Sequence, residues 1–155
     1  MGTKHMPDKT IITNIDWFRE HEGEVIATSP AIEISKQKIQ EFCRAIDNDE
    51  WVHWDEERSA NAFGGIIAPL FMAPALFPTL FFESLEYGDF NALFSGSDRF
   101  RLISPILEGD QLCATTKIER VEDKDKGIAV FYDVTFHVAR QEQPVAVGTF
   151  VLRYW

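Results

Sequence analysis

Several features that would each indicate a class of protein are scarce in this sequence or missing from it. Lysine and arginine number 15 against 25 aspartates and glutamates, a formal net charge of −10, and no basic cluster is present. Because nucleic-acid binding relies on lysine and arginine to neutralise phosphates, this charge argues against a nucleic-acid partner. No apolar run reaches the roughly 18 residues that a membrane-spanning helix needs, and three prolines interrupt the most apolar stretch, residues 66–82. We therefore expect no membrane partner either.

Cysteine is scarce as well, with Cys43 and Cys113 as the only two. Both lie inside apolar patterns, which predicts free thiols in a reducing cytoplasm and neither a disulfide nor a metal site. The first residues, MGTKHM, contain no apolar signal segment. We interpret residues 1–10, which include His5, as an expression remnant or disordered N-terminus. One domain is expected over residues 11–155.

Hydrophobic residues make up 45% of the chain, with thirteen phenylalanines, which is ample for one core. Ser35 is a typical N-cap, and Ile39, Phe42, Cys43 and Ile46 follow it at helical spacing. This pattern predicts a helix with one buried face. The helix should end at residues 47–49, Asp-Asn-Asp, whose side chains compete for backbone hydrogen bonds.

A second helix is expected after the glycine pair at residues 64–65. Pro69 suits a first helical turn, so the helix should begin near Ala68. Its residues are apolar nearly all round, as expected of a helix that other elements surround. Pro74 and Pro78 are expected to kink it or to end it.

The second half of the chain changes to a period of two, typical of strands. Strands are predicted near residues 24–28, 98–103, 112–118, 128–138 and 145–154. Turns are predicted at residues 109–110, 122–127 and 141–144. Long antiparallel strands after a buried helix predict an α+β domain: a curved antiparallel sheet wrapped around a long central helix.

The polar segment between the two helices carries the best candidate for chemistry. It holds His53 between Trp51 and Trp54, among four carboxylates. An imidazole, with an ordinary pKa near 6.5, is available as a base at neutral pH. A histidine in a polar loop is, however, also a common structural or surface residue. Asn48 and Asp47 have an equally simple interpretation as turn residues that end the preceding helix.

Several parts of the sequence, in their order along the chain, resemble a known family. The parts are the first helix, His53 a few residues after an acidic cluster, the GGIIAP segment that leads into the second helix, the SPILEGDQL turn and the series of long strands. The chain is similar to the MaoC-like hotdog family from about Ile32 to the C-terminus. That family comprises (R)-specific enoyl-thioester hydratases and hydroxyacyl-thioester dehydratases. The resemblance implies a single hotdog domain.

The resemblance also implies residue roles. In active members an Asp, and a His five residues later, activate one water; His53 occupies the His position and Asn48 the Asp position, with Asp47 one place before. A backbone N–H at the start of the central helix polarises the thioester carbonyl, and Leu70 stands where these members have glycine. Because of these departures, the pattern is closest to N-terminal halves or accessory subunits, which bind the acyl chain for a catalytic partner.

The implied reaction is hydration or dehydration of the C2–C3 bond of an acyl thioester, without metal or redox cofactor. The implied substrate is a coenzyme A thioester in preference to an acyl carrier protein, and the implied assembly is a homodimer or a heterodimer with another hotdog subunit. A non-catalytic accessory subunit and a hotdog thioesterase are the alternatives. Substrate-binding positions implied by the match are Trp51, Trp54, Gly64, Gly65, Ile66, Leu70 and Phe71. By default, five phenylalanines are assigned to the core: Phe71, Phe77, Phe81, Phe82 and Phe94.

Overall fold

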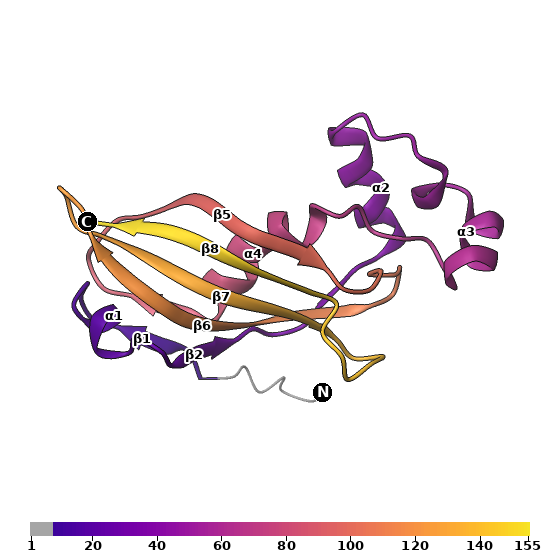
Figure 1. The fold of residues 1–155 in the computed structure, drawn as a ribbon. Helices are drawn as coiled ribbons and strands as arrows, with labels where there is room; N and C mark the ends of the chain where they lie inside the picture. The colour runs from indigo at the N-terminus through magenta and orange to yellow at the C-terminus, as the bar shows by residue number, and fades with distance from the viewer. Residues whose placement is uncertain (1–7) are drawn as a thin grey trace, which may run out of the picture.

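A computed structural model describes residues 8–155, and its main feature is a curved six-stranded antiparallel sheet (Figure 1). The strands run in the order β2-β6-β7-β8-β5, and the short β3 also pairs with β6. Their bounds are β2 (Val25–Thr28), β3 (Ile32–Glu33), β5 (Ala92–Leu102), β6 (Gln111–Asp123), β7 (Ile128–Val138) and β8 (Ala146–Tyr154). The predicted series of long antiparallel strands is confirmed, and β5 begins earlier than expected.

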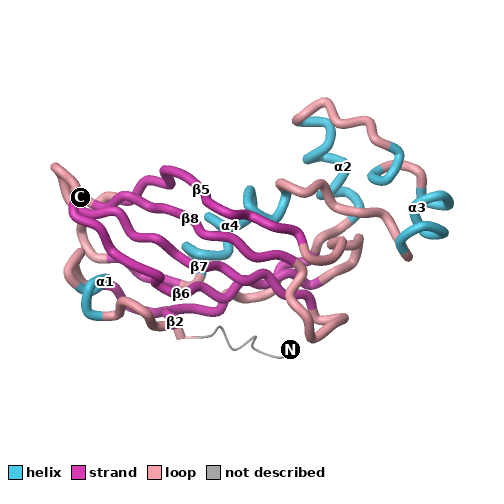
Figure 2. Tube along the Cα trace, viewed as in Figure 1, coloured by secondary structure: helices cyan, strands magenta, loops and turns pink. Residues whose placement is uncertain are grey.

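Alternation along the strands gives the sheet one apolar face. In β7 the six predicted inward residues are all at most 3% exposed: Ile128, Val130, Tyr132, Val134, Phe136 and Val138. From Phe131 to His137 the intervening residues, such as Asp133 and Thr135, are only half-buried and lie on the opposite face. The inner face needs an apolar cover, and α4 (Met72–Glu83) supplies it, as Figures 1 and 2 show.

The central helix α4 begins at Met72, four residues later than predicted. The expected start is wrong because Ala68 remains extended and donates its N–H to the Ile106 carbonyl at 2.8 Å. Pro69 therefore lies in the turn that precedes the helix. Pro78 lies inside α4 and does not end it. The helix has 12 residues and continues to Glu83.

Two of the five phenylalanines assigned to the core lie there. Phe77 and Phe81 are at most 2% exposed, whereas Phe71, Phe82 and Phe94 are 65%, 40% and 38% exposed. The assignment is wrong for these three because Phe71 precedes α4, Phe82 lies in its last turn and Phe94 lies on the edge strand β5. Their rings still contact neighbouring rings, as Phe94 does with Phe77 and Phe150, so these residues lie at the margin of the core.

The predicted first helix is α2 (Lys36–Ala45), and its cap is confirmed. The Ser35 hydroxyl accepts the N–H of Lys38 at 3.1 Å. Ile39 and Cys43 are fully buried, but Ile46 is 52% exposed and lies beyond the last turn, so its assignment to the buried face is wrong. Cys43 and the half-buried Cys113 are both free thiols, as predicted.

Two short helices occupy the segment expected to be a loop. They are the 3-10 turn η1 (Trp51–His53) and α3 (Glu56–Phe63). The Asp55 carboxylate caps α3 by accepting the N–H of Arg58 at 3.0 Å, and Gly64 ends it in the left-handed conformation with φ +91°. Together with α2 they lie beyond one end of the sheet (Figure 1).

The N-terminal part adds β1 (Thr10–Ile12) and α1 (Trp17–Glu20), and β1 pairs in parallel with β4 (Leu85–Tyr87). Most of the segment interpreted as a remnant, residues 1–7 with His5, lies outside the described residues. Thr10 belongs to β1, and its hydroxyl donates to the Ile26 carbonyl, so the folded domain includes residue 10. None of the helices in residues 8–155 has the length and hydrophobicity that crossing a bilayer requires.

Candidate active site

His53 is the last residue of η1, and its side chain is 5% exposed. Its Nδ1 lies 2.6 Å from the carbonyl oxygen of Ile67. Because a carbonyl oxygen only accepts hydrogen bonds, Nδ1 must carry the proton, and in the neutral ring Nε2 keeps its lone pair. The backbone therefore selects the tautomer that a general base requires.

The chain that precedes α4 is attached to η1 by further hydrogen bonds. The N–H of Ile67 donates to the Val52 carbonyl at 3.1 Å. The fully buried hydroxyl of Ser59 lies 3.0 Å from that carbonyl and 2.9 Å from the Gly65 carbonyl. Residues 65–67 thus hold a fixed position against the histidine turn. Ser59 was missed from the sequence, where its only signal is a small polar residue in a charged segment.

A buried carboxylate, that of Asp110, holds the other side of the segment that precedes α4. Asp110 is 6% exposed; its Oδ2 accepts the N–H of Leu107 at 2.8 Å, and its Oδ1 lies 2.8 Å from Nε of Arg140. Leu107 in turn pairs with Ile67, the residue that accepts from His53. Asp110 belongs to the SPILEGDQL turn, whereas Arg140 is 30 residues away and carried no sequence signal.

Asn48 and Asp47 lie at the end of α2. The Asn48 side-chain oxygen accepts the N–H of Glu50 at 3.0 Å, and its backbone carbonyl accepts from the Trp54 indole at 3.0 Å. Asp47 is exposed and has φ +53°. No hydrogen bond joins either residue to His53 within residues 8–155. Their local role is to end the helix, and their catalytic role stays a prediction.

The two tryptophans lie on different sides of the histidine turn. Trp54 lines a cavity of about 390 Å³ together with Asp47 and Asn48, so the structure brings these three predicted residues together. Trp51 stacks on Phe63 with ring centroids 6.0 Å apart, and the Arg58 guanidinium lies over its ring at 3.8 Å.

The residues predicted to polarise a carbonyl precede α4. Ile66 is fully buried, and its N–H lies 3.5 Å from the Glu108 carboxylate. The N–H of Leu70 donates no hydrogen bond within the described part of the chain. It lies two residues before α4, at the end of the helix where backbone N–H groups favour negative charge. Leu70 and Phe71 are 44% and 65% exposed, so their apolar side chains are open to a ligand or a partner.

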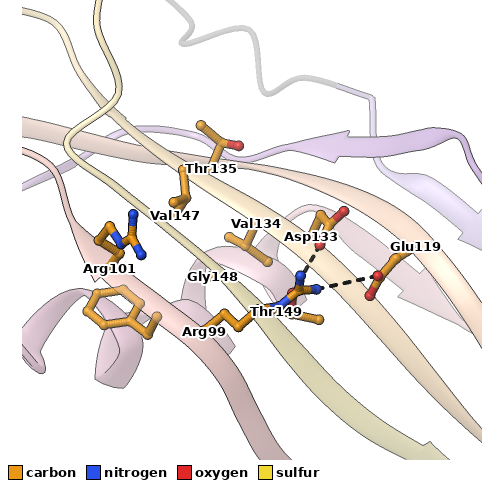
Figure 3. Close-up of a pocket in the computed structure, with 10 residues that line it drawn as sticks. Arg99, Arg101, Glu119, Asp133, Val134, Thr135, Val147, Gly148 and Thr149 are labelled. Carbon is orange, nitrogen blue, oxygen red and sulfur yellow. Dashed lines mark hydrogen bonds and ion pairs between the residues drawn. The ribbon is translucent and has the colours of Figure 1, made fainter.

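Another cavity, of about 620 Å³, lies elsewhere, on the outer face of the sheet (Figure 3). The Arg99 guanidinium reaches Glu119 at 3.5 Å across it, and the Thr149 hydroxyl donates to Asp133 at 3.0 Å. No predicted site residue lines this cavity. Within residues 8–155, no group of His, Cys, Asp and Glu side chains is arranged to hold a metal ion.

Comparison with known protein sequences matches this chain to dehydratases. A family model described as "FAS1-like, dehydratase domain region" matches residues 20–147. The 3-hydroxyacyl-thioester dehydratase Z of Mycobacterium tuberculosis H37Rv is 30% identical over 135 residues, 85% of this chain and 89% of that protein.

Solved structures share the fold at lower identity. A MaoC-like dehydratase from Rhodospirillum rubrum superposes with a TM-score of 0.71 at 19% identity, covering 86% of this chain and 92% of that one. A chain of the HadBC (3R-hydroxyacyl-ACP dehydratase) complex of Mycobacterium tuberculosis gives 0.67 at 22% identity, covering 85% and 96%. The sheet around a central helix is a hotdog domain, as predicted. The family model and the 30% identical dehydratase show that the chain belongs to the MaoC-like hotdog dehydratase family.

Proposed function

We propose that this protein is a hydro-lyase subunit that adds water to, or removes it from, the C2–C3 bond of an acyl thioester. The family and the 30% identical 3-hydroxyacyl-thioester dehydratase support this reaction class. The observation that carries it is the 2.6 Å contact of His53 Nδ1 with the Ile67 carbonyl, which leaves Nε2 as a base. We also propose that the protein is located in the cytoplasm.

The proposed step needs a single base. In hydration, Nε2 of His53 takes a proton from water as the water oxygen adds to C3, and electrons move from the C2–C3 double bond toward the thioester carbonyl. The imidazolium then returns a proton to C2 as the carbonyl is restored. Both groups arrive from the side of His53, so addition is syn. The free N–H of Leu70 is the proposed donor to the carbonyl oxygen. Proton transfer and carbonyl polarisation need neither metal nor redox cofactor.

The test compares His53→Asn with wild type in an enoyl-absorbance assay on a panel of trans-2-enoyl-CoA substrates. The asparagine amide nitrogen occupies the position of Nδ1 and can donate to the Ile67 carbonyl, but asparagine cannot act as a base, so we expect the fold to be retained and chemistry to be lost. We expect a fall in kcat of about 100-fold or more, the usual contribution of a general base. His137→Asn is the matched control, because His137 lies on the outer face of β7. Unchanged turnover in His53→Asn would refute the proposal.

A second hotdog subunit is the proposed partner. Within the described chain β5 pairs only with β8, so its other edge has unpaired backbone groups. Apolar side chains beside this edge are exposed, including Phe71, Leu93 and Ile103 at 65%, 56% and 52%. An edge strand with adjacent exposed apolar side chains fits pairing with the same strand of another subunit.

This pairing is tested with Gly96→Lys in β5. A side chain at Gly96 meets no atom within 4 Å, so the monomer should tolerate it. Because Gly96 lies near the middle of β5, lysines there would bring two like charges close together in an antiparallel β5–β5 pair. We expect wild type to elute as a dimer in light-scattering chromatography and the variant to dissociate, with Gly96→Ala as the neutral control. A monomeric wild type would refute self-pairing and leave a different hotdog chain as the proposed partner.

The accessory-subunit alternative rests on Asn48. Its side chain is engaged with the Glu50 N–H, and it cannot take a proton. A folded wild-type protein without turnover across the substrate panel would favour this alternative and refute independent catalysis. A hotdog thioesterase would instead release free thiol, which a thiol reagent detects in the same assay.

A further inference from the structure

Ser59 is a fully buried polar residue to which the proposed reaction assigns no role. It lies in the middle of α3, and its backbone N–H donates to the Asp55 carbonyl at 2.9 Å. Because α3 comes directly after η1, Ser59 is only six residues from His53 along the chain. A buried hydroxyl has one proton and needs an acceptor for it. Which acceptor it uses shows which parts of the chain it joins.

The Ser59 hydroxyl bonds outside its own helix. A serine in a helix commonly donates to the carbonyl four residues before it, as Ser84 at the end of α4 does with the Leu80 carbonyl at 2.7 Å. Ser59 instead lies 3.0 Å from the Val52 carbonyl oxygen, in η1, and 2.9 Å from the Gly65 carbonyl oxygen, in the segment that leads to α4. Its hydroxyl therefore joins two separate segments of the chain and not one turn of α3.

Of the two acceptors, the Gly65 carbonyl is the one that depends on Ser59. The Val52 carbonyl also accepts the N–H of Ile67 at 3.1 Å. Within residues 8–155 the Gly65 carbonyl accepts from no donor except the Ser59 hydroxyl, and Gly65 is buried. Because a buried carbonyl without a donor is costly, we expect residue 65 to move when the hydroxyl is removed.

Movement at Gly65 would reach the acceptor for His53 two residues later. Ile67 is joined to the histidine turn twice, because its N–H donates to the Val52 carbonyl and its carbonyl accepts from His53 Nδ1 at 2.6 Å. The bridge to Leu107 holds only the other edge of the same segment. A neutral imidazole can carry its proton on either nitrogen, and the hydrogen bond that one nitrogen makes decides which. The position of the Ile67 carbonyl therefore decides the tautomer.

We propose that the Ser59 hydroxyl is a positioning group, which holds the Ile67 carbonyl against His53 Nδ1 and so selects the tautomer in which Nε2 is the base. This inference rests on the proposed function. Ser59 is fully buried, so it acts through the imidazole and not on the substrate. Without the hydroxyl, the Nδ1–H tautomer loses its advantage over the Nε2–H tautomer, in which Nε2 cannot accept a proton.

The first test determines the tautomer by NMR, with 15N-labelled histidine at about pH 8.5, about two units above the ordinary imidazole pKa. Long-range 1H–15N correlations separate the two tautomers, and the signals lost in His53→Asn assign His53. We expect the Nδ1–H tautomer in wild type and a mixture of both tautomers in Ser59→Ala. His21, whose Nδ1 lies 2.8 Å from the Trp17 carbonyl oxygen, is an internal reference that should not change. Unchanged His53 signals in Ser59→Ala would overturn the proposal.

Ser84→Ala is the matched control for this measurement. Like Ser59→Ala, it removes a buried hydroxyl that donates to a backbone carbonyl, but it does so at the end of α4. The His53 tautomer in Ser84→Ala should be that of wild type. An equal change in both variants would show that any loss of a buried hydroxyl disturbs the imidazole, and the positioning role of Ser59 would be overturned.

The second test is kinetic and uses an enoyl-CoA substrate. Ser59→Ala should lower kcat about fivefold at unchanged KM, the loss expected when one ordinary hydrogen bond no longer favours the reactive tautomer. Ser84→Ala should turn over as wild type does. An unchanged kcat in Ser59→Ala, or a raised KM in place of a lowered kcat, would overturn the proposal. If wild type has no turnover but the tautomer changes in Ser59→Ala, the proposed function fails and the positioning of the imidazole by Ser59 stands.

Discussion

Replacing Asp110 with asparagine should destabilise the protein and slow the reaction, although Asp110 is not a catalytic residue. The side chain of Asp110 is 5% exposed and that of Arg140 36%. The carboxylate accepts from Arg140 Nε at 2.8 and 3.1 Å and from the Leu107 N–H at 2.8 Å. Breaking a fully buried ion pair costs about 3–5 kcal/mol. Because the Arg140 side chain keeps contact with water and asparagine still accepts one hydrogen bond, we expect a loss of about 2–3 kcal/mol.

Urea unfolding at pH 7.5 measures this loss, and Glu56→Gln is the control. Glu56 pairs with Lys36 at 2.7 Å, but both side chains are exposed, so breaking that pair should leave the unfolding midpoint unchanged. The Asp110 variant should also lower kcat in folded protein, since Leu107 pairs with Ile67, the acceptor for His53. A midpoint in Asp110→Asn equal to that of the control would refute this account of the site.

Three further predictions concern the core, the hairpin and the thiols. Burial holds the pKa of Tyr132 and Tyr154 well above the usual range, so above pH of about 10 only the unfolded chain loses these protons and stability should fall. Tyr132→Phe should therefore lose less stability than wild type between pH 8 and 11 in urea titrations; an equal loss would contradict this. Gly127→Ala should cost about 2 kcal/mol or more, whereas Gly23→Ala, with similar φ but nothing within 4 Å, should cost clearly less in the same assay. Burial raises the pKa of the Cys43 thiol, so iodoacetamide should modify it much more slowly in native than in urea-unfolded protein, and equal rates would show that it is accessible.

The strands and the first helix could be predicted because their signals are local. Alternation from residue 128 to residue 138 determines which face of β7 is buried, since successive side chains in a strand point to opposite faces. Ser35 and the apolar spacing after it place α2 correctly, because the cap satisfies backbone groups within one turn. The family resemblance, carried by short motifs around His53 and Asp110, was also sufficient to assign the fold.

The features that were missed depend on contacts between distant segments. The helix α4 begins at Met72 and not near Ala68 because Ile67 pairs with Leu107 and the Ala68 N–H donates to Ile106. This pairing joins segments about 40 residues apart, which local spacing does not reveal. The helix α3 has a weak apolar pattern, and its buried Ser59 bonds across to Val52 and Gly65.

The sequence by itself determined the antiparallel sheet and its buried face, because both depend on side-chain order along the chain. The family resemblance supplied the hotdog assignment and His53 as the candidate base, whose catalytic role stays a prediction. Only the tertiary structure decided the tautomer of His53, because its Nδ1 donates to the Ile67 carbonyl. Ile67 pairs with Leu107, the Leu107 N–H donates to the Asp110 carboxylate, and that carboxylate pairs with Arg140.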